Sequence, residues 1–351
     1  MTSLHGVVCK RPPLFFINPT FDIIQNMNNL GFWKKLKRPI LALAPMADLT
    51  DSPFRQIVAS KGRPDVFFNE FVSADGLCLN GKDSLLPLLR FGKVEHPIVA
   101  QLFGSKPENF YQAARIIVQL GFDGIDINMG CPFKKIEKQG AGAALIENPK
   151  LAQMIILETK RGAKKIPVSV KTRIGYHREI VREWIPEILK ADPAVITIHG
   201  RTRNEKSKVG THWEVIGKAA KIVRKSGKRS LIIGNGDINS LEEAKTKAKK
   251  YNLDGIMIGR AIWKNPWFFA AKNVNSVPIT ERIATLVEHA KIYESFHRNK
   301  KNFHDLRKFY SSYISSFKGA KRLRMKMMTA ENSEEVEKIA AHFFREDGVS
   351  F

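Results

Sequence analysis

Cys131 lies in a loop whose composition suits a reactive thiol. In the segment DINMGCPFKKIEKQGAG an apolar run gives way to a glycine-punctuated basic loop at this residue. Gly130 allows close backbone approach, Pro132 stiffens the turn, and Lys134 and Lys135 favour anions nearby. A lone cysteine is most often a small apolar core residue. This loop position instead favours a thiol presented into a pocket, as a nucleophile or as a general acid.

Side chains that could contact a ligand also follow the other short apolar runs of the chain. A polar residue after one run is often only the point where a strand meets solvent, but a barrel enzyme builds its site from the ends of several strands. Eight such run ends therefore indicate one shared pocket. They carry Met46, Asn69 with Glu70, Gln101, Asn128 with Cys131, Lys171 with Arg173, His199 with Arg201, Asn235 with Asp237, and Gly259 with Arg260.

Two of these positions place basic groups in line with buried strands. Lys171, in PVSVKTRIG, would lose hydration there unless its ammonium met an anion or an electron-rich ring, and Arg173 follows with the same parity. His199, in VITIHGRTR, would by itself be interpreted as a satisfied histidine at the rim. In the company of Lys171, it is expected to bind a cofactor or a substrate.

Two glycine-containing segments late in the chain are typical of a phosphate site. In (β/α)8 barrels the loops after strands seven and eight often bind phosphate through backbone N–H groups. GNGD, residues 234–237, and IGRA, residues 258–261, offer bare backbone and one guanidinium at these two places. No GxGxxG follows an apolar run, so a Rossmann-type dinucleotide site is not expected. The predicted ligand is a phosphorylated cofactor lying over the barrel mouth.

The elements that must position these residues form a repeated βα pattern. Eight continuously apolar runs begin near residues 40, 65, 96, 122, 166, 194, 230 and 254, and amphipathic stretches lie between most of them. Continuous runs are typical of strands that are covered on both faces. A doubly wound open sheet has similar local signals, but ligand-type residues at every strand end favour a (β/α)8 TIM barrel.

Composition limits the partners and the compartment. The 351 residues carry a formal net charge of +24 and only three cysteines, which favours a polyanionic partner and excludes a disulfide framework. The chain has no CxxC pair, no apolar run of the ~18 residues that a membrane span needs, and no secretion signal. We therefore expect a cytoplasmic monomer without a metal.

Three segments are expected along the chain. Residues 1–33 show no periodicity and are predicted to be a poorly ordered extension, residues 34–278 to form the barrel, and residues 279–351 to form a helical domain. Within the last segment, KIYESFHRNKKNFHDLRKFYSSYISSFKGAKRLRMK holds eleven Lys or Arg against two acidic residues, a balance of 11 − 2 = +9. Its interleaved aromatics are expected to form a core, and its cations to contact phosphates.

Seven motifs, in this order and spacing, resemble those of one enzyme family. LAPMADLTDSPFR, NEFVSADGL, INMGCPFKKIEKQGAGAALI, VKTRIG, IHGRTR, IGNGDI and IGRAIWKNPWFF are similar to motifs of the tRNA-dihydrouridine synthases. The resemblance implies an FMN-dependent reduction of the 5,6 double bond of particular uridines in tRNA, with NADPH or NADH supplying electrons to the flavin. FKGAKRLRMKMM resembles the family's C-terminal helical domain, which implies that this segment binds tRNA.

The resemblance also implies roles for individual residues. Cys131 would be the general acid that donates a proton to C5 of the uracil while hydride reaches C6. Asn128 would orient the flipped uracil, and Arg173 and Arg201 would contact the substrate. The implied FMN ligands are Pro45, Met46 and Ala47 against the ring, Gln101, Lys171 and His199 as its hydrogen-bond partners, and Asn235, Gly236, Asp237, Gly259 and Arg260 at the phosphate.

One loop departs from the family pattern, and two other functions stay open. GRTRNEKSKVGTHW stands where the family usually has GRTREQ followed by a substrate-contacting Tyr, so Ser207 takes the Tyr position and Glu205 that of Gln. A flavin barrel acting on a free pyrimidine is one alternative, although such a small substrate needs no field of +24. A non-enzymatic RNA-binding barrel is the other, and Ser207 is the feature that allows it.

Overall fold

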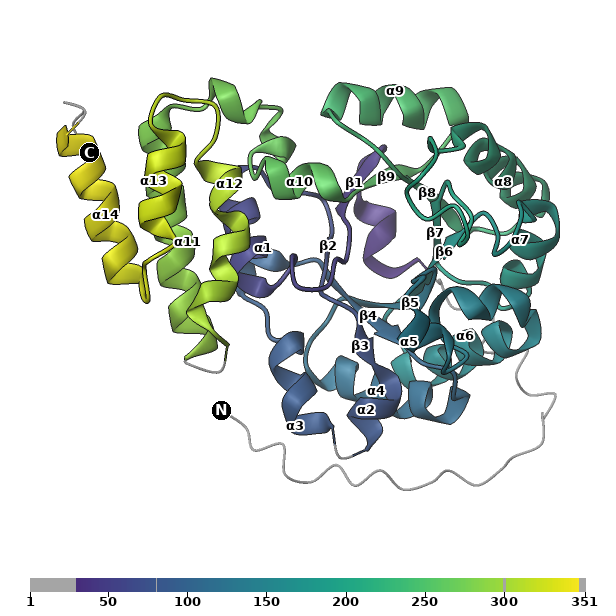
Figure 1. Cartoon of the computed structure of the whole chain (residues 1–351). Coiled ribbons are helices and arrows are strands. Elements are labelled where there is room, and N and C mark those ends of the chain that lie inside the picture. Colours follow the sequence, from purple (N-terminus) through teal and green to yellow (C-terminus); the bar gives the residue numbers. More distant parts are fainter. Residues whose placement is uncertain (1–29, 80, 299–300, 347–351) are drawn as a thin grey trace.

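A computed structural model describes residues 30–79, 81–298 and 301–346 of the chain. A parallel barrel surrounded by helices forms the larger part, and a group of helices from the C-terminal third is stacked against one side of it (Figure 1). Most of the predicted N-terminal extension, residues 1–29, lies outside the described residues. Among the helices in the described ranges, none is long and apolar enough to cross a membrane.

Every apolar run that the sequence singled out holds a parallel strand, and the second run holds two short ones. Neighbours follow the order β1-β9-β8-β7-β6-β5-β4-β2, β3 pairs with β4, and a bridge from Ala42 to Val66 joins the two ends. The predicted TIM barrel is therefore confirmed in place of an open sheet. The strands are β1 Ile40–Leu43, β2 Phe67–Phe68, β3 Val72–Ser73, β4 Ile98–Phe103, β5 Gly124–Met129, β6 Val168–Arg173, β7 Val195–His199, β8 Leu231–Asn235 and β9 Gly255–Ile258.

Two polar residues, Asn69 and Glu70, separate the short strands β2 and β3 within the second apolar run. The side-chain Oδ1 of Asn69 accepts a hydrogen bond from the backbone N–H of Gln101 at 2.7 Å, in the place of a backbone carbonyl. Glu70, which is buried, accepts a hydrogen bond from the N–H of Asp48 at 2.6 Å. The end of β2 is thereby tied to β4 on one side and to the loop after β1 on the other.

Side chains that point into the barrel form a separate apolar cluster at its N-terminal end. Alternate residues of the strands, such as Ile40 and Ala42 of β1 and Val195 of β7, contribute to it. Trp33 closes this end, because the 3-10 helix Gly31–Lys35 places its ring inside the cluster with only 1% of the residue exposed. With one end filled by apolar side chains, the polar residues of the strands are left to the opposite end.

The helices of the repeats cover the outside of the barrel. They bury one apolar face each, as in α4, where Phe110, Ala113, Ala114 and Ile117 are buried at helical spacing. The side chain of Asp51 caps α1 by accepting a hydrogen bond from the N–H of Phe54 at 3.1 Å. The helices are α1 Ser52–Lys61, α2 Ala74–Cys78, α3 Lys82–Leu85, α4 Pro107–Gln119, α5 Lys134–Glu137, α6 Pro149–Ala163, α7 Val181–Lys190, α8 Trp213–Lys225, α9 Leu241–Tyr251 and α10 Arg260–Lys264.

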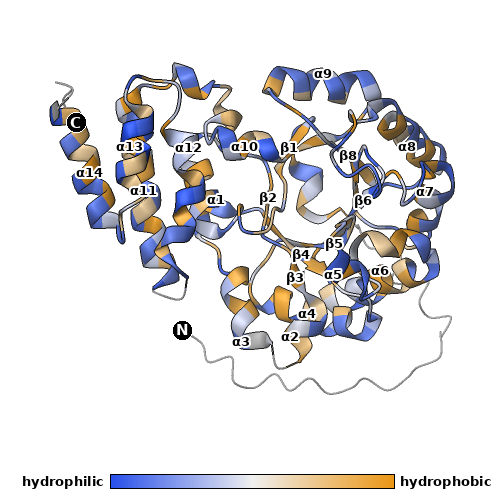
Figure 2. Cartoon of the chain, in the orientation of Figure 1, coloured by the Kyte–Doolittle hydropathy of each residue, from blue (hydrophilic) through white to orange (hydrophobic). Residues whose placement is uncertain are grey.

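The C-terminal helices share one apolar core with the outside of the barrel. Phe54 of α1 stacks on Phe309 at 4.8 Å between ring centroids, and Arg282 donates to the carbonyl of Tyr313 at 2.8 Å. The aromatics of this segment are largely buried, whereas Lys318, Lys321 and Arg322 are exposed; α13 is mostly hydrophilic in Figure 2. The helices are α11 Ile279–His297, α12 Tyr310–Tyr313, α13 Ala320–Met327 and α14 Ser333–Glu346.

Candidate active site

The loop after β5 holds Cys131 at the C-terminal end of the barrel. The side-chain Oδ1 of Asn128 accepts hydrogen bonds from the N–H groups of Gly130 at 3.1 Å and Cys131 at 2.9 Å, which folds the chain into a tight turn. Gly142 has a positive φ of +63°, and a Cβ there would lie 2.8 Å from the carbonyl oxygen of Cys131. Glycine is therefore needed at position 142, where the chain passes close to Cys131. In this loop Cys131 is 8% exposed.

The environment of Cys131 keeps its thiol protonated. Burial raises the pKa of Cys131 from its ordinary value of 9.0, and this outweighs the backbone N–H of Phe133 and the charges of Arg173 and Lys171, which favour the thiolate. At neutral pH the side chain is therefore a thiol with a proton to give. The same neighbours would stabilise the thiolate once that proton has left.

A chain of hydrogen bonds runs from the barrel interior to the Cys131 loop. The buried carboxylate of Asp126 accepts from Nε2 of Gln101 at 2.7 Å, and Oε1 of Gln101 accepts from Nδ2 of Asn128 at 3.0 Å. Asn128 in turn caps the turn that contains Cys131. Three neighbouring positions on β4 and β5 therefore orient one another.

Lys171 and His199 extend the site along β6 and β7. Burial lowers the pKa of Lys171 to about 8, with Arg173 acting in the same direction and Asp126 against it. Burial also brings the pKa of His199 well below its ordinary value, and the nearby Arg173 and Lys171 add to this effect. At neutral pH the site thus combines an ammonium with an uncharged imidazole. Within the described ranges, no hydrogen bond or ion pair joins Nζ of Lys171 to another residue.

The loops after β8 and β9 meet through the carboxylate of Asp237. It accepts hydrogen bonds from Arg201 and, at 2.5 Å, from Nη2 of Arg260. Burial acts to raise the pKa of Asp237, but these two arginines outweigh it and lower the pKa. Gly236, with φ of +136°, lies so close to Thr211 that a Cβ would be 2.6 Å from its Oγ1. The glycine is therefore required where the loop after β8 approaches the loop after β7.

Two arginines hold the surrounding loops in place. Arg173 donates from Nε to the carbonyl of Gly130 at 2.7 Å and from Nη1 to that of Thr202 at 3.2 Å, and burial lowers its pKa to about 10. Arg201 donates from Nε to the carbonyl of Val209 at 2.6 Å and is 2% exposed. Both residues are therefore part of the framework of the site as well as a source of positive charge.

The loop that departs from the family pattern contacts the Cys131 loop directly. Arg203 forms an ion pair with Glu137, and its guanidinium lies over the ring of Tyr176 at 5.1 Å. Glu205 accepts a hydrogen bond from the N–H of Thr202 at 2.7 Å and thus stabilises its own loop. Ser207 is exposed on this loop. Although its sequence departs from the family pattern, the loop after β7 is therefore anchored to the Cys131 loop, by the ion pair of Arg203 with Glu137.

Several groups at this end of the barrel remain available to a ligand. Nδ2 of Asn69 and Oγ1 of Thr197 are buried without a hydrogen-bond partner in the described part of the chain, in addition to the ammonium of Lys171. A Cβ at Gly259 would make only ordinary van der Waals contacts, with Ala44 and Met46, both at 3.9 Å. The unpartnered polar groups are of the kind that could hydrogen-bond a flat ring with several heteroatoms.

The predicted site residues lie on the strand ends and loops of one end of the barrel. Asn69, which the sequence predicted at a strand end, lies there too, as do two residues that the sequence did not place in the site: Asp126 and Phe133, which is 63% exposed two positions after Cys131. A charged residue inside the apolar run FDGIDIN was the signal that could have identified Asp126. Asn69 was visible as a strand end, and the exposure of Phe133 was not predictable from the sequence.

Fold and site together define a (β/α)8-barrel protein with its functional residues at the C-terminal ends of the strands. The family model described as "Dihydrouridine synthase (Dus)" matches residues 42–347. The chain belongs to this family.

Curated relatives resemble the chain over most of its length. "Probable tRNA-dihydrouridine synthase 2" of Bacillus subtilis (strain 168) is 40% identical, over 91% of this chain and 99% of the relative. "Probable tRNA-dihydrouridine synthase" of Staphylococcus aureus (strain N315) is 38% identical, over 89% of this chain and 95% of the relative. A solved complex of 2-naphthoyl-CoA reductase shares the fold, with a TM-score of 0.53 and 12% identity over 69% of this chain and 51% of the other.

Proposed function

We propose that this protein is a tRNA-dihydrouridine synthase that reduces the C5–C6 double bond of uridines in tRNA, with FMN as cofactor and NADPH as reductant, in the cytoplasm. One hydride and one proton are added to the uracil, and NADPH is oxidised to NADP⁺. The observation that carries the proposal is the buried thiol of Cys131, held on the loop after β5 at the barrel end where Lys171 also lies. Membership of the family supports it.

The chain's own residues fit FMN at this end of the barrel. Gln101, Lys171 and His199 would hydrogen-bond the heteroatoms of the ring, with Pro45, Met46 and Ala47 against its face. Nδ2 of Asn69 would supply a further donor. When bound, FMN supplies the hydride for C6 of the uracil. The uncharged His199 can accept as well as donate a hydrogen bond, whereas Lys171 only donates.

The phosphate of FMN would lie between the loops after β8 and β9. Asn235, Gly236 and Gly259 offer backbone there, and the guanidinium of Arg260 offers the charge. Asp237 is itself an anion, so we assign it to the orientation of Arg260 rather than to direct phosphate contact. The carboxylate of Asp237 pairs with Arg201 as well, so it joins the loops after β7, β8 and β9.

Cys131 would act as the general acid. Its raised pKa keeps the proton on sulfur until a carbanion-like C5 is presented, and the N–H of Phe133 and the charge of Arg173 then stabilise the thiolate. Asn128 and Arg173 would hold the uracil, and Arg201 would add positive charge beside it. Arg173 uses Nε and Nη1 for backbone carbonyls, and no partner is found for its Nη2 among the described residues.

Binding of tRNA would involve the C-terminal helices as well as the barrel mouth. A uridine inside a folded tRNA must be extruded to reach the site. The exposed cations of α13 and the formal net charge of +24 suit an RNA backbone, and residues 279–351 would form the tRNA-binding domain next to the catalytic barrel of residues 34–278. One protein molecule would suffice for this arrangement, so we propose a monomer.

The test is dihydrouridine formation in tRNA that lacks the modification, mapped by position, with purified protein, FMN and NADPH. The wild type is expected to form product on tRNA and none on free uridine, and Cys131→Ala to form little. Cys78→Ala is the matched control, because Cys78 is a half-buried thiol on α2 outside the site. Absence of product from wild-type protein whose flavin NADPH reduces would refute the proposed function.

A further inference from the structure

Asp126 is a buried ionisable residue in the barrel interior, next to the site. It is fully buried on β5, and its two carboxylate oxygens accept hydrogen bonds from Oγ of Ser169 at 2.6 Å and from Nε2 of Gln101 at 2.7 Å. Burying an ionised carboxylate costs free energy unless hydrogen bonds or a nearby opposite charge compensate for it. Two features of the surroundings of Asp126 provide such compensation.

The first feature is the direction of the hydrogen-bond chain from Asp126 to Cys131. An ionised carboxylate only accepts, so Gln101 must turn its amide nitrogen toward Asp126 and its oxygen toward Asn128. Asn128 must then turn its own oxygen toward the N–H groups of Gly130 and Cys131. Every donor along this series of hydrogen bonds meets an acceptor in only one orientation of the two amides. The orientation of the Gln101 amide toward a ligand is therefore fixed.

The second feature is the charge of Lys171 on the neighbouring strand. Burial raises the pKa of Asp126 to about 6 and lowers that of Lys171 to about 8, and each of the two groups favours the charged form of the other. At pH 7 both are therefore charged. Neither group forms a direct ion pair with an oppositely charged side chain in the described ranges. The carboxylate of Asp126 therefore acts on the charge of Lys171 through the barrel interior, without direct contact.

We propose that Asp126 is a positioning residue of the cofactor site: its carboxylate fixes the Gln101 amide and offsets the charge of Lys171, and it thereby lowers the reduction potential of bound FMN. This inference rests on the proposed function. A positive charge beside the ring stabilises the reduced cofactor, which is more negative than the oxidised form. With Asp126 in place, the reduced cofactor is a better hydride donor to the uracil.

The experiment measures the midpoint potential of FMN bound to the holoprotein at pH 7, without tRNA. Asp126→Asn removes the charge at nearly constant shape. It is expected to raise the ratio of reduced to oxidised cofactor about tenfold at a given ambient potential, which for a two-electron couple is a rise in midpoint potential of about 30 mV. In a Lys171→Met background, the same substitution is expected to shift the ratio less than twofold. Asp123→Asn, the same charge change just before β5, is the control and is expected to leave the potential unchanged.

Three outcomes would overturn the proposal: an unchanged potential in Asp126→Asn, a shift in the opposite direction, or an equal shift with Lys171 absent. If Asp126→Asn does not fold, Asp126→Ser, which removes the charge and leaves room for water, gives the same comparison. The readout is independent of tRNA. A wild type that shows these potentials but forms no dihydrouridine would refute the proposed function and leave the role of Asp126 intact.

Discussion

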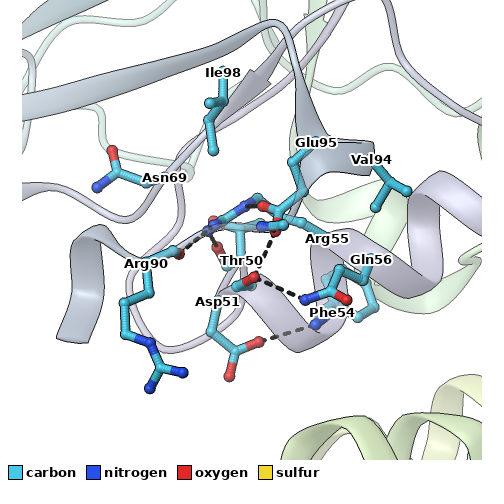
Figure 3. Close-up of polar contacts among 12 residues, drawn as sticks. Thr50, Asp51, Phe54, Arg55, Gln56, Asn69, Arg90, Val94, Glu95 and Ile98 are labelled. Carbon is cyan, nitrogen blue, oxygen red and sulfur yellow. Dashed lines mark hydrogen bonds and ion pairs between the residues drawn. The ribbon is translucent and has the colours of Figure 1, made fainter. Parts of the chain in front are cut away.

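Removing the charge of Glu95 is expected to destabilise the protein strongly and to loosen the loop after β1, which holds the proposed FMN contacts Pro45, Met46 and Ala47. Glu95 and Arg55 form an ion pair in which both side chains are almost completely buried, at 0% and 1% exposure (Figure 3). The carboxylate also accepts hydrogen bonds from Oγ of Ser52 at 2.5 Å and from the N–H of Gly92 at 2.7 Å. Glu95→Gln keeps the shape and part of these hydrogen bonds, but leaves the guanidinium of Arg55 without its counter-charge.

The magnitude follows from that uncompensated charge. Breaking a buried ion pair by removing one partner costs about 3–5 kcal/mol, because the remaining charge stays out of water. Arg55 cannot turn to solvent, since its Nη1 donates to the carbonyl of Thr50 at 2.6 Å and its Nη2 to that of Arg90 at 3.3 Å. We therefore expect the free energy of unfolding to fall by about 3–5 kcal/mol.

The same network supports the proposed cofactor loop. Thr50, which Arg55 holds by its carbonyl, binds the loop after β1 by accepting from the N–H of Met46 at 2.9 Å and donating to its carbonyl at 3.1 Å. Glu95→Gln is therefore expected to weaken FMN binding as well as stability. Thr50→Val separates the two effects, because it removes the bonds to Met46 and leaves the ion pair in place.

Urea unfolding and FMN titration provide the assay. Glu95→Gln should lower the urea midpoint at an unchanged m-value, and Thr50→Val should weaken FMN binding with a smaller loss of stability. Glu334→Gln breaks an exposed pair with Lys338, at 73% and 70% exposure, and serves as a control without a measurable effect. A loss below about 1 kcal/mol in Glu95→Gln would show that Arg55 is not confined as described and would refute this reasoning.

Four further outcomes are expected. Product formation should not fall as the pH rises from 6 to 7, because burial raises the pKa of the acid Cys131 above its ordinary value of 9.0, and Lys171, with a pKa of about 8, still carries its charge; a fall between pH 6 and 7 would contradict this. Lys171→Met should weaken FMN binding and lower its midpoint potential, as redox titration can test. Phe133→Ala should weaken tRNA binding about tenfold by loss of base stacking, whereas Met154→Ala, at a residue that is 50% exposed on α6, should not. The Kd for tRNA should rise steeply with salt, and a flat response would exclude phosphate contacts.

The sequence by itself determined the barrel and the set of strands that carry the site. Strands covered on both faces are continuously apolar, so each run could be identified without its partners. Where a parallel barrel forms, the ends of all strands meet at one face, so Gln101, Lys171 and His199 could be expected together. The loop of Cys131 was also evident, because glycine permits backbone conformations that other residues avoid and proline restricts φ, and both effects are local.

Only the tertiary structure decided which side chains pair across that face. Arg203 meets Glu137 and Arg201 meets Asp237 through contacts between loops that are far apart in sequence. Trp33, which the sequence analysis placed in an extension, fills the barrel end, because several strands contribute to the apolar cluster against which it packs. The protonation of Cys131 and the charge balance of Asp126 and Lys171 depend on burial and on neighbours from other strands. These are consequences of register and packing, which no local pattern in the sequence encodes.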